Sequence, residues 1–294
     1  MKTTINKLVA IFISLIILLG GIYVFQESKF KSEDLRVVFC DVGQGDAIYI
    51  KTPGGQDILI DGGPDEKVLN CLSKNMPFWD REIELIVATH PDADHITGLI
   101  SVLDRYSLIN YVSEKTENQG ILVKKLQAKL AEKKITANSL KSGDRIVFAD
   151  QTKIEVLWPS ENVLKNNTIA LKNSYSIITD NDLSIVTLLT YGDFKLLLTG
   201  DAGVSVLSII QDEIGDIDIL KVPHHGSKTG MDQKILSSIT PEVAVISVGK
   251  NNRYGHPAKQ IMELLLDNNI KTLRTDQVGD IQITSNGKSY ALMQ

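Results

Sequence analysis

The chain has 294 residues, 43% of them hydrophobic, and a formal net charge of −5 at neutral pH. This length and apolar content allow one large core of mixed helices and strands, and they exclude a disordered or repeat protein, because no low-complexity tract or repeat appears after residue 35. Residues 1–30 carry three lysines and one glutamate, so the rest of the chain has a net charge of −7, which argues against a domain that grips duplex DNA through a broad basic surface.

The first predicted element is a membrane-spanning helix at about residues 8–25. These 18 residues are apolar apart from Ser14, and Lys2 and Lys7 precede them. A helix of that length spans about 27 Å, close to the thickness of a bilayer core. No small-residue cleavage site follows Phe25, which favours an uncleaved signal anchor over residues 1–30 rather than a cleaved signal peptide. Since positive flanks stay in the cytoplasm, residues 31–294 are expected outside the plasma membrane, in the periplasm or extracellular space.

Alternating strands and helices are predicted after the anchor. The predicted strands are 35–41, 46–52, 57–61, 84–89, 107–112, 144–148, 152–158, 184–191, 194–199, 217–222, 243–248, 271–275 and 280–285. The predicted helices are 65–75, 95–105, 118–134, 202–214, 231–239 and 257–268. No linker divides them, so this pattern predicts a single α/β domain built from packed layers.

Two cysteines lie in the first of these elements. Cys40 is in the first predicted strand and Cys71 in the first predicted helix, without a Cys-x-x-Cys spacing. An exported domain could pair them, but the sequence favours two small buried hydrophobic side chains.

The densest cluster of polar side chains follows the predicted strand that ends at Thr89. Four potential metal ligands occur within six residues, namely His90, Asp92, Asp94 and His95. Neutral imidazoles and carboxylates suit zinc, manganese or iron. The alternative is a polar loop in which Asp94 caps the following helix.

Two later strand ends repeat this arrangement. Asp201 follows the strand that ends at Thr199, and His224 and His225 follow the strand that ends at Val222. Taken alone, a Gly-Asp pair after a strand is usually a turn or a helix cap. Because open sheets tend to place their sites at the carboxyl ends of strands, these side chains are predicted to meet.

The order of the motifs resembles a known family. The motifs are Asp41–Ala47, Ile60–Gly63, His90–His95, Leu198–Asp201, Val222–Ser227 and Tyr254–Pro257. Over roughly residues 35–293 the chain resembles the metallo-β-lactamase superfamily, and more narrowly the hydrolase domain at the C-terminal end of the ComEC DNA-uptake proteins. The resemblance implies a four-layer αββα sandwich with one or two divalent metal ions, zinc or manganese, at one edge between the two sheets.

The resemblance also implies metal ligands. Asp94, His95 and His225 would hold one metal ion, and Asp201 would bridge it to the other. His224 is the alternative to His225.

The first metal position departs from the superfamily pattern. His90 and Asp92 would hold this ion, but Asp92 stands where most members have a histidine, and no histidine lies between the two clusters to supply a third nitrogen. Water, Asn181 or the carboxylate of Asp46 could complete the site. Fewer imidazoles shift the preference from zinc toward manganese.

The expected activity is metal-assisted hydrolysis of a phosphodiester, a nuclease or phosphodiesterase reaction in which metal-bound hydroxide attacks. Asp94 would orient the hydroxide, His256 would hold the phosphate or protonate the leaving group, and Asp61 would support a ligand histidine. His256 could equally be a plain loop residue, and Asp61 part of a plain turn.

The substrate is less well defined. Ser227, Lys228, Arg253 and Arg274 lie in motif loops and could contact a phosphate oxygen. Single-stranded DNA is one candidate substrate, and channel subunits for DNA uptake are candidate partners. The alternatives are a non-catalytic metal-binding envelope protein and a hydrolase of esters or lactams.

Overall fold

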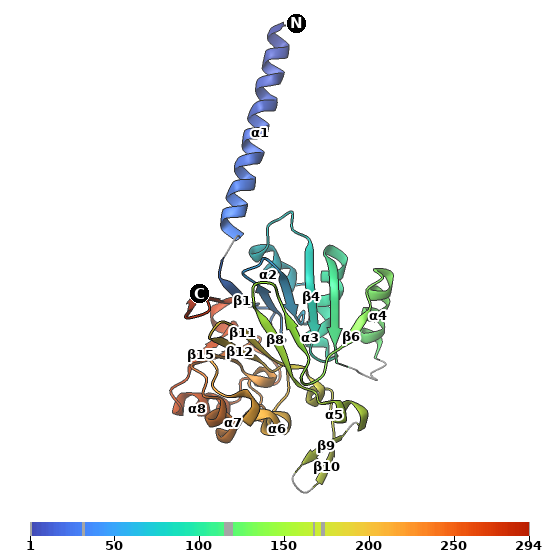
Figure 1. Ribbon diagram of the computed structural model, residues 1–294, viewed down its shortest axis with the longest axis vertical. Helices are drawn as coiled ribbons and strands as arrows, with labels where there is room; N and C mark the ends of the chain where they lie inside the picture. The colour runs from blue at the N-terminus through green and yellow to red at the C-terminus, as the bar shows by residue number, and fades with distance from the viewer. Residues whose placement is uncertain (1, 31–32, 115–119, 167, 172–173, 294) are drawn as a thin grey trace.

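The computed structural model describes residues 2–30, 33–114, 120–166, 168–171 and 174–293. Two β-sheets face each other in the domain, and α1 (Lys2–Phe30) projects away from them (Figure 1).

The first sheet has eight strands in the order β17-β16-β1-β2-β3-β4-β5-β6. Its strands are β1 (Leu35–Phe39), β2 (Ile48–Lys51), β3 (Asp57–Ile60), β4 (Glu82–Ala88), β5 (Ser107–Ser113), β6 (Ala137–Ser139), β16 (Ile281–Ser285) and β17 (Tyr290–Met293). Strands β3 to β6 run parallel to one another, and the other pairs are antiparallel. Strand β16 near the end of the chain therefore pairs with β1, which begins the domain, and β17 pairs with β16 at the edge of the sheet.

The second sheet has seven strands in the order β15-β14-β13-β12-β11-β8-β7. Its strands are β7 (Arg145–Val147), β8 (Lys153–Trp158), β11 (Val186–Tyr191), β12 (Phe194–Leu198), β13 (Ile219–Lys221), β14 (Val243–Ile246) and β15 (Lys271–Arg274). Strands β12 to β15 are parallel. A separate hairpin of β9 (Thr168–Leu171) and β10 (Ser174–Ile177) extends from the domain (Figure 1).

Helices cover the outer face of each sheet. The first sheet packs against α2 (Val68–Asn75), α3 (Ala93–Arg105) and α4 (Ile121–Glu132) through one apolar cluster. The second packs against α6 (Val204–Ile214), α7 (Gln233–Ile239) and α8 (Lys259–Asp267) through another. A third cluster, which includes Phe39, Val87 and Leu196, fills the space between the sheets. The expected four-layer αββα sandwich is therefore confirmed.

The shorter helices are α5 (Glu161–Asn166), α9 (Thr275–Val278) and the 3-10 turns η1 (Asn181–Leu183) and η2 (Pro223–Gly226). Five of the observed features are not predicted from the sequence, namely α5, α9, β6, β17 and the hairpin of β9 and β10. Each is short, and β6 is exposed throughout, so the hydrophobic periodicity that reveals longer elements is weak in them. Residues 118–119 of the predicted helix at 118–134 lie outside the described residues.

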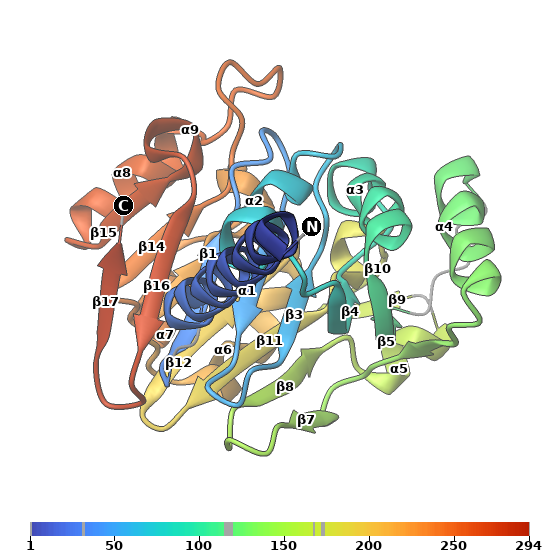
Figure 2. The same cartoon turned by 90° about the horizontal axis from the view of Figure 1, so that it is seen from above.

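Helix α1 is long and apolar enough to cross a membrane. Its mean hydropathy is 2.8 over the most apolar 18 residues of Thr4–Phe30, and none of that window is buried. Figure 2 views the domain from the side on which α1 projects. At the domain end of the helix Phe30 is buried, and the ring of Tyr23 stacks on Trp79 in the loop between α2 and β4, with ring centroids 5.1 Å apart.

The cysteines differ from the sequence prediction. Cys40 and Cys71 form a disulfide bond across 31 residues, with their Cα atoms 5.7 Å apart. The prediction of two unpaired hydrophobic side chains was wrong, because the packing of α2 on the first sheet brings together two cysteines whose sequence spacing gives no indication of contact. Both remain buried in the apolar cluster beneath α2.

Candidate metal centre

The His90–His95 segment joins β4 to α3. Because parallel β4 is central in its sheet, its carboxyl end delivers Thr89 and His90 to the space between the two sheets. Asp92 is at the N-cap position of α3 but makes no capping bond with its side chain, and Asp94 lies in the first turn. The alternative reading of Asp94 as a helix cap therefore does not describe this segment.

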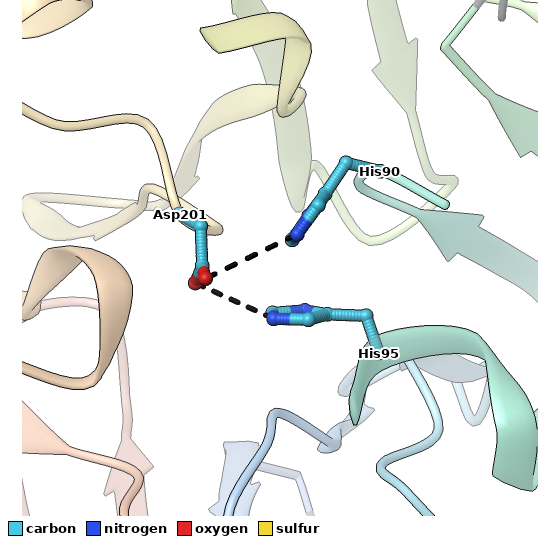
Figure 3. Close-up of side chains that lie close together, drawn as sticks. All are labelled: His90, His95 and Asp201. Atoms are coloured by element: carbon cyan, nitrogen blue, oxygen red, sulfur yellow. Dashed lines mark ion pairs between the residues drawn. The ribbon is translucent and has the colours of Figure 1, made fainter. Parts of the chain in front are cut away.

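His90, His95 and Asp201 converge from three elements (Figure 3). Asp201 follows β12 of the second sheet, and Gly203, not Asp201, occupies the N-cap position of α6. The Asp201 carboxylate lies 3.4 Å from His95 Nε2 and 4.0 Å from His90 Nε2. One ligand atom from each of the three residues lies within 4.8 Å of the others, which is close enough to share a cation.

A second group of the same kind contains Asp94, His95 and His225. Nε2 of His225 lies 3.4 Å from Asp94 Oδ2 and 3.6 Å from Asp201 Oδ1. Asp46 adds a further carboxylate, because it forms groups with Asp201 and His225 and with Asp61 and His95. Asp94, His95 and His225, which the resemblance assigns to one metal ion, thus lie close together. Of the pair assigned to the other ion, Asp92 is the more peripheral: its Oδ2 atom lies 3.8 Å from His90 Nε2, and its side chain is 44% exposed.

The hydrogen bonds of the three histidines leave the same ring atom free. His95 Nδ1 donates to Asp61 Oδ2 at 2.8 Å, and His225 Nδ1 donates to the Ser247 carbonyl at 2.9 Å. Thr89 donates its hydroxyl to Asp61 and can accept from His90 Nδ1 at 3.0 Å. Each Nε2 atom consequently points at the centre, where it is available to bind a cation.

These free atoms fit a metal ion. Nε2 of all three histidines and one oxygen each of Asp46 and Asp201 are buried without a hydrogen-bond partner among the described residues. Buried polar atoms without partners are costly, so their concentration here calls for a cation. Imidazole nitrogens with carboxylate oxygens form a donor set that suits zinc or manganese.

The electrostatics of the centre favour the ionised forms of Asp94 and Asp201. Burial would raise the pKa of Asp94, but the close approach of His225 and the charges of His95 and His225 lower it to about 2. Burial would also raise the pKa of Asp201, which His225 and His95 hold well below its usual range. Burial lowers the pKa of His90 well below its usual value, which favours the neutral form that binds metals.

Lys221 also lies in this centre, and the sequence analysis missed it. Its side chain is fully buried, and Nζ donates to the Gly200 carbonyl at 2.8 Å, forms an ion pair with Asp46 and lies 3.8 Å from Asp201 Oδ1. A signal was present in the sequence, because buried parallel strands such as β13 are normally continuous apolar runs and a lysine interrupts this one.

His224, Asn181 and His256 form the outer edge of the centre. His224 Nε2 lies 3.7 Å from Asp201 Oδ2, and Asn181 Nδ2 lies 3.4 Å from the His224 ring nitrogens. The His256 ring is 5.7 Å from that of His224 and stacks against Tyr254 at 5.8 Å. Asn181 therefore contacts a histidine of the outer edge rather than the pair of His90 and Asp92.

The four residues predicted to contact a phosphate are only partly available. Arg274 is bound to Asp276 through two hydrogen bonds, and the Ser227 hydroxyl pairs with that of Thr229 at 3.2 Å. Lys228 is exposed, and Arg253 is exposed with its guanidinium against the Tyr254 ring. Lys228 and Arg253 are thus the two exposed candidates, whereas Arg274 would have to break its bonds to a carboxylate and Ser227 its bond to a hydroxyl.

Comparison with known proteins identifies the family. A model of the metallo-beta-lactamase superfamily matches residues 40–250, well over half of the chain. The chain belongs to the metallo-β-lactamase superfamily. It is a hydrolase of that superfamily, whose fold typically binds one or two divalent metal ions, and the His/Asp cluster described above lies where the matched motifs converge.

Curated relatives include competence proteins, as the resemblance predicted. ComE operon protein 3 of Bacillus subtilis is 28% identical over 85% of this chain and 33% of its own length. Recombination protein 2 of Haemophilus influenzae is 29% identical over 76% of this chain and 26% of its length. Competence protein ComA of Neisseria gonorrhoeae is 26% identical over 91% and 35%. The chain thus spans about a quarter to a third of these relatives.

Solved structures agree on the fold. The metallo-beta-lactamase fold protein YhfI from Bacillus subtilis is 11% identical and superimposes with a TM-score of 0.56, covering 86% of this chain and all of that protein. A long form of RNase Z from yeast is 15% identical with a TM-score of 0.50, covering 85% of this chain and 42% of the other. At these identities the likeness concerns the fold alone.

Proposed function

We propose that this hydrolase is a metal-dependent phosphodiesterase or nuclease, anchored in the plasma membrane by residues 1–30, with residues 31–294 facing outward. The observation that carries the proposal is the convergence of three buried histidines, each with a free Nε2, on the carboxylate of Asp201. A purely structural polar cluster would pair these atoms with one another or with the backbone.

The proposed ligand assignment follows these positions. His90 and Asp92 would hold one ion, Asp94, His95 and His225 would hold the other, and Asp201 would contribute to both. Bound divalent cations would activate a water molecule and neutralise charge on the phosphoryl oxygens. Asp61 fixes the ring of His95, and the Ser247 carbonyl fixes that of His225, so that both Nε2 atoms keep their direction.

Other residues act on water and on the substrate. Asp94 is ionised at neutral pH because its pKa is lowered to about 2, and as a hydrogen-bond acceptor it would orient the attacking water. At the outer edge, His256 is placed to contact the scissile phosphate or the leaving group. Its Nδ1 atom is buried without a partner among the described residues, so the contact would come from Nε2.

Two independent features support the outward orientation. Lys2 and Lys7 flank the N-terminal side of the apolar stretch, and positive flanks stay in the cytoplasm. The disulfide between Cys40 and Cys71 is typical of an oxidising compartment, and such bonds are rare in the cytosol.

The proposed substrate class is a phosphodiester. Single-stranded DNA is the first candidate, because similar relatives include ComE operon protein 3 and competence protein ComA. The net charge of −7 outside the anchor favours a local contact with a strand end over broad binding of duplex DNA. Channel subunits for DNA uptake are the corresponding candidate partners.

The test is hydrolysis by the purified full-length chain in detergent, loaded with manganese or zinc. Single-stranded DNA, bis-p-nitrophenyl phosphate, a phosphocholine ester and a β-lactam would be compared. We expect turnover of the phosphodiesters, and we expect Asp201→Ala to abolish most of it and to lower the amount of bound metal, because one carboxylate serves both ions.

Asp212→Ala is the matched control, because this carboxylate is exposed on α6. It should keep full activity and metal content. Cleavage of the β-lactam or the ester alone would support the alternative of an ester or lactam hydrolase. Bound metal without turnover of any substrate would favour a non-catalytic metal-binding envelope protein and refute the proposal.

A further inference from the structure

The loop between α2 and β4 exposes two aromatic side chains beside the apolar helix. Phe78 is 60% exposed and Trp79 is 37% exposed, and their rings meet edge to face with centroids 4.9 Å apart. Other exposed apolar side chains of the domain, such as Ile121 and Leu266, lie on other elements, whereas Phe78 and Trp79 form a contiguous aromatic pair beside α1, which indicates a contact surface.

Helix α1 meets this loop along one of its faces. Tyr23 stacks on Trp79 with an interplanar angle of 22°, Phe30 is buried against the domain, and Gln26 and Glu27 between them are partly buried. Residues spaced by three, four and seven lie on the same side of a helix. The aromatic loop is therefore placed along the final two turns of α1, not only at its end.

The contact with Tyr23 sets the depth of the loop. Tyr23 lies two residues before the end of the apolar stretch at 8–25, which corresponds to about 3 Å along a helix. Trp79 lies against it, at the level where a bilayer around α1 would change from hydrocarbon to headgroups. Tryptophan and tyrosine favour this level because their rings are apolar with one polar group.

A groove next to the loop carries four charged side chains. Its lining includes Glu27, Glu33, Lys51 and Asp80, together with Phe30, Pro77 and Trp79. Trp79 thus lies between these charged side chains and Tyr23 on the apolar part of α1.

We propose that Phe78 and Trp79 insert into the outer membrane–water interface next to α1 and seat the hydrolase domain on the lipid surface. This inference rests on the proposed anchor. The surface formed by Phe78 and Trp79 would contact the same bilayer that holds α1.

The test uses tryptophan fluorescence, because the chain has only two tryptophans and Trp158 is buried. Full-length Trp158→Phe reports on Trp79 alone, and full-length Trp79→Phe is the matched control that reports on Trp158. Both would be placed in nanodiscs containing phosphatidylcholine brominated near the headgroup end of its chains. We expect Trp79 to lose most of its emission and to be shielded from aqueous iodide, while Trp158 emission stays unchanged.

A second variant tests the cooperation of the two rings. Phe78→Ser should raise the iodide quenching of Trp79 toward its value in detergent. Because Phe78 is exposed, the substitution should leave the fold intact, and circular dichroism would check this. Flotation with liposomes separates the two proposals. A chain that does not float refutes the anchor, whereas a chain that floats with Trp79 open to iodide and unquenched by brominated lipid overturns this inference alone.

Discussion

At the scale of single residues, Lys221 is the least expected member of the centre. A fully buried ammonium group lies among the carboxylates of Asp46 and Asp201, where it offsets part of their charge. Such a pair is expensive to break, because the remaining charge is left buried without a partner.

Lys221→Met should therefore destabilise the metal-free protein by about 3–5 kcal/mol. Added manganese or zinc should recover more stability in the variant than in the wild type, because a cation then supplies the missing charge. Urea unfolding in EDTA and in excess metal would measure both effects, with exposed Lys228→Met as the control. Equal unfolding midpoints of Lys221→Met and wild type in EDTA would contradict this account.

Asp61 acts on the centre through His95. It accepts hydrogen bonds from Thr89 N and Oγ1 and from His95 Nδ1, all at 2.7–2.8 Å. Replacement by asparagine removes the negative charge and puts an N–H donor against at least one of these donors.

We expect Asp61→Asn to fold and to bind metal about 10–100-fold more weakly. Competition with a coloured chelator would give the affinity, and Asp65→Asn, an exposed aspartate near the same loop, should match the wild type. Unchanged affinity in Asp61→Asn would show that His95 needs no orienting carboxylate.

At the scale of elements, the disulfide ties the end of β1 to α2. Closing a 31-residue loop constrains the unfolded chain, which corresponds to about 3–4 kcal/mol of stability. Cys40→Ala with Cys71→Ala should lower stability by roughly that amount and should make the melting temperature insensitive to reductant. A wild-type melting temperature that does not change in dithiothreitol would argue against the bond.

The same scale shows what the sequence could predict. Long periodic runs predicted β4, α3, α6 and β12 close to their observed bounds, because burial of one face imposes the pattern. Asp201 and His225 could be placed with the His90–His95 segment since each follows a strand. The disulfide, Lys221 and the pairing of Asn181 with His224 arise from the way the two sheets meet, and no local pattern in the sequence encodes that arrangement.

At the scale of the whole molecule, stability should depend on pH through Asp57. Burial raises the pKa of Asp57 to about 6, although Lys51 and the Tyr49 hydroxyl lower it. Because the pKa of Asp57 is higher in the folded protein than its unfolded value of about 3.9, folding favours the protonated carboxyl. The contribution of this carboxyl to the free energy of unfolding is largest below pH 4 and is lost as the pH rises through 6.

Metal-free wild type should therefore lose about 2 kcal/mol between pH 4 and 7 relative to Asp57→Asn, which cannot titrate. EDTA keeps both proteins free of metal. Because both contain the same histidines, the titration of the histidines cancels in the difference between the two stability curves. Parallel stability curves for the two proteins over this range would be the contrary result.

In the proposed anchored orientation, strand β4 sets the distance between the metal centre and the lipid. It leaves the aromatic loop at Glu82 and runs away from α1 for seven residues (Figure 1), and His90 follows its last residue by two positions. Seven extended residues cover about 23 Å. The proposed orientation therefore predicts substrates that are dissolved molecules, or a polymer whose free end rises this far above the membrane, rather than lipid headgroups whose tails stay in the bilayer.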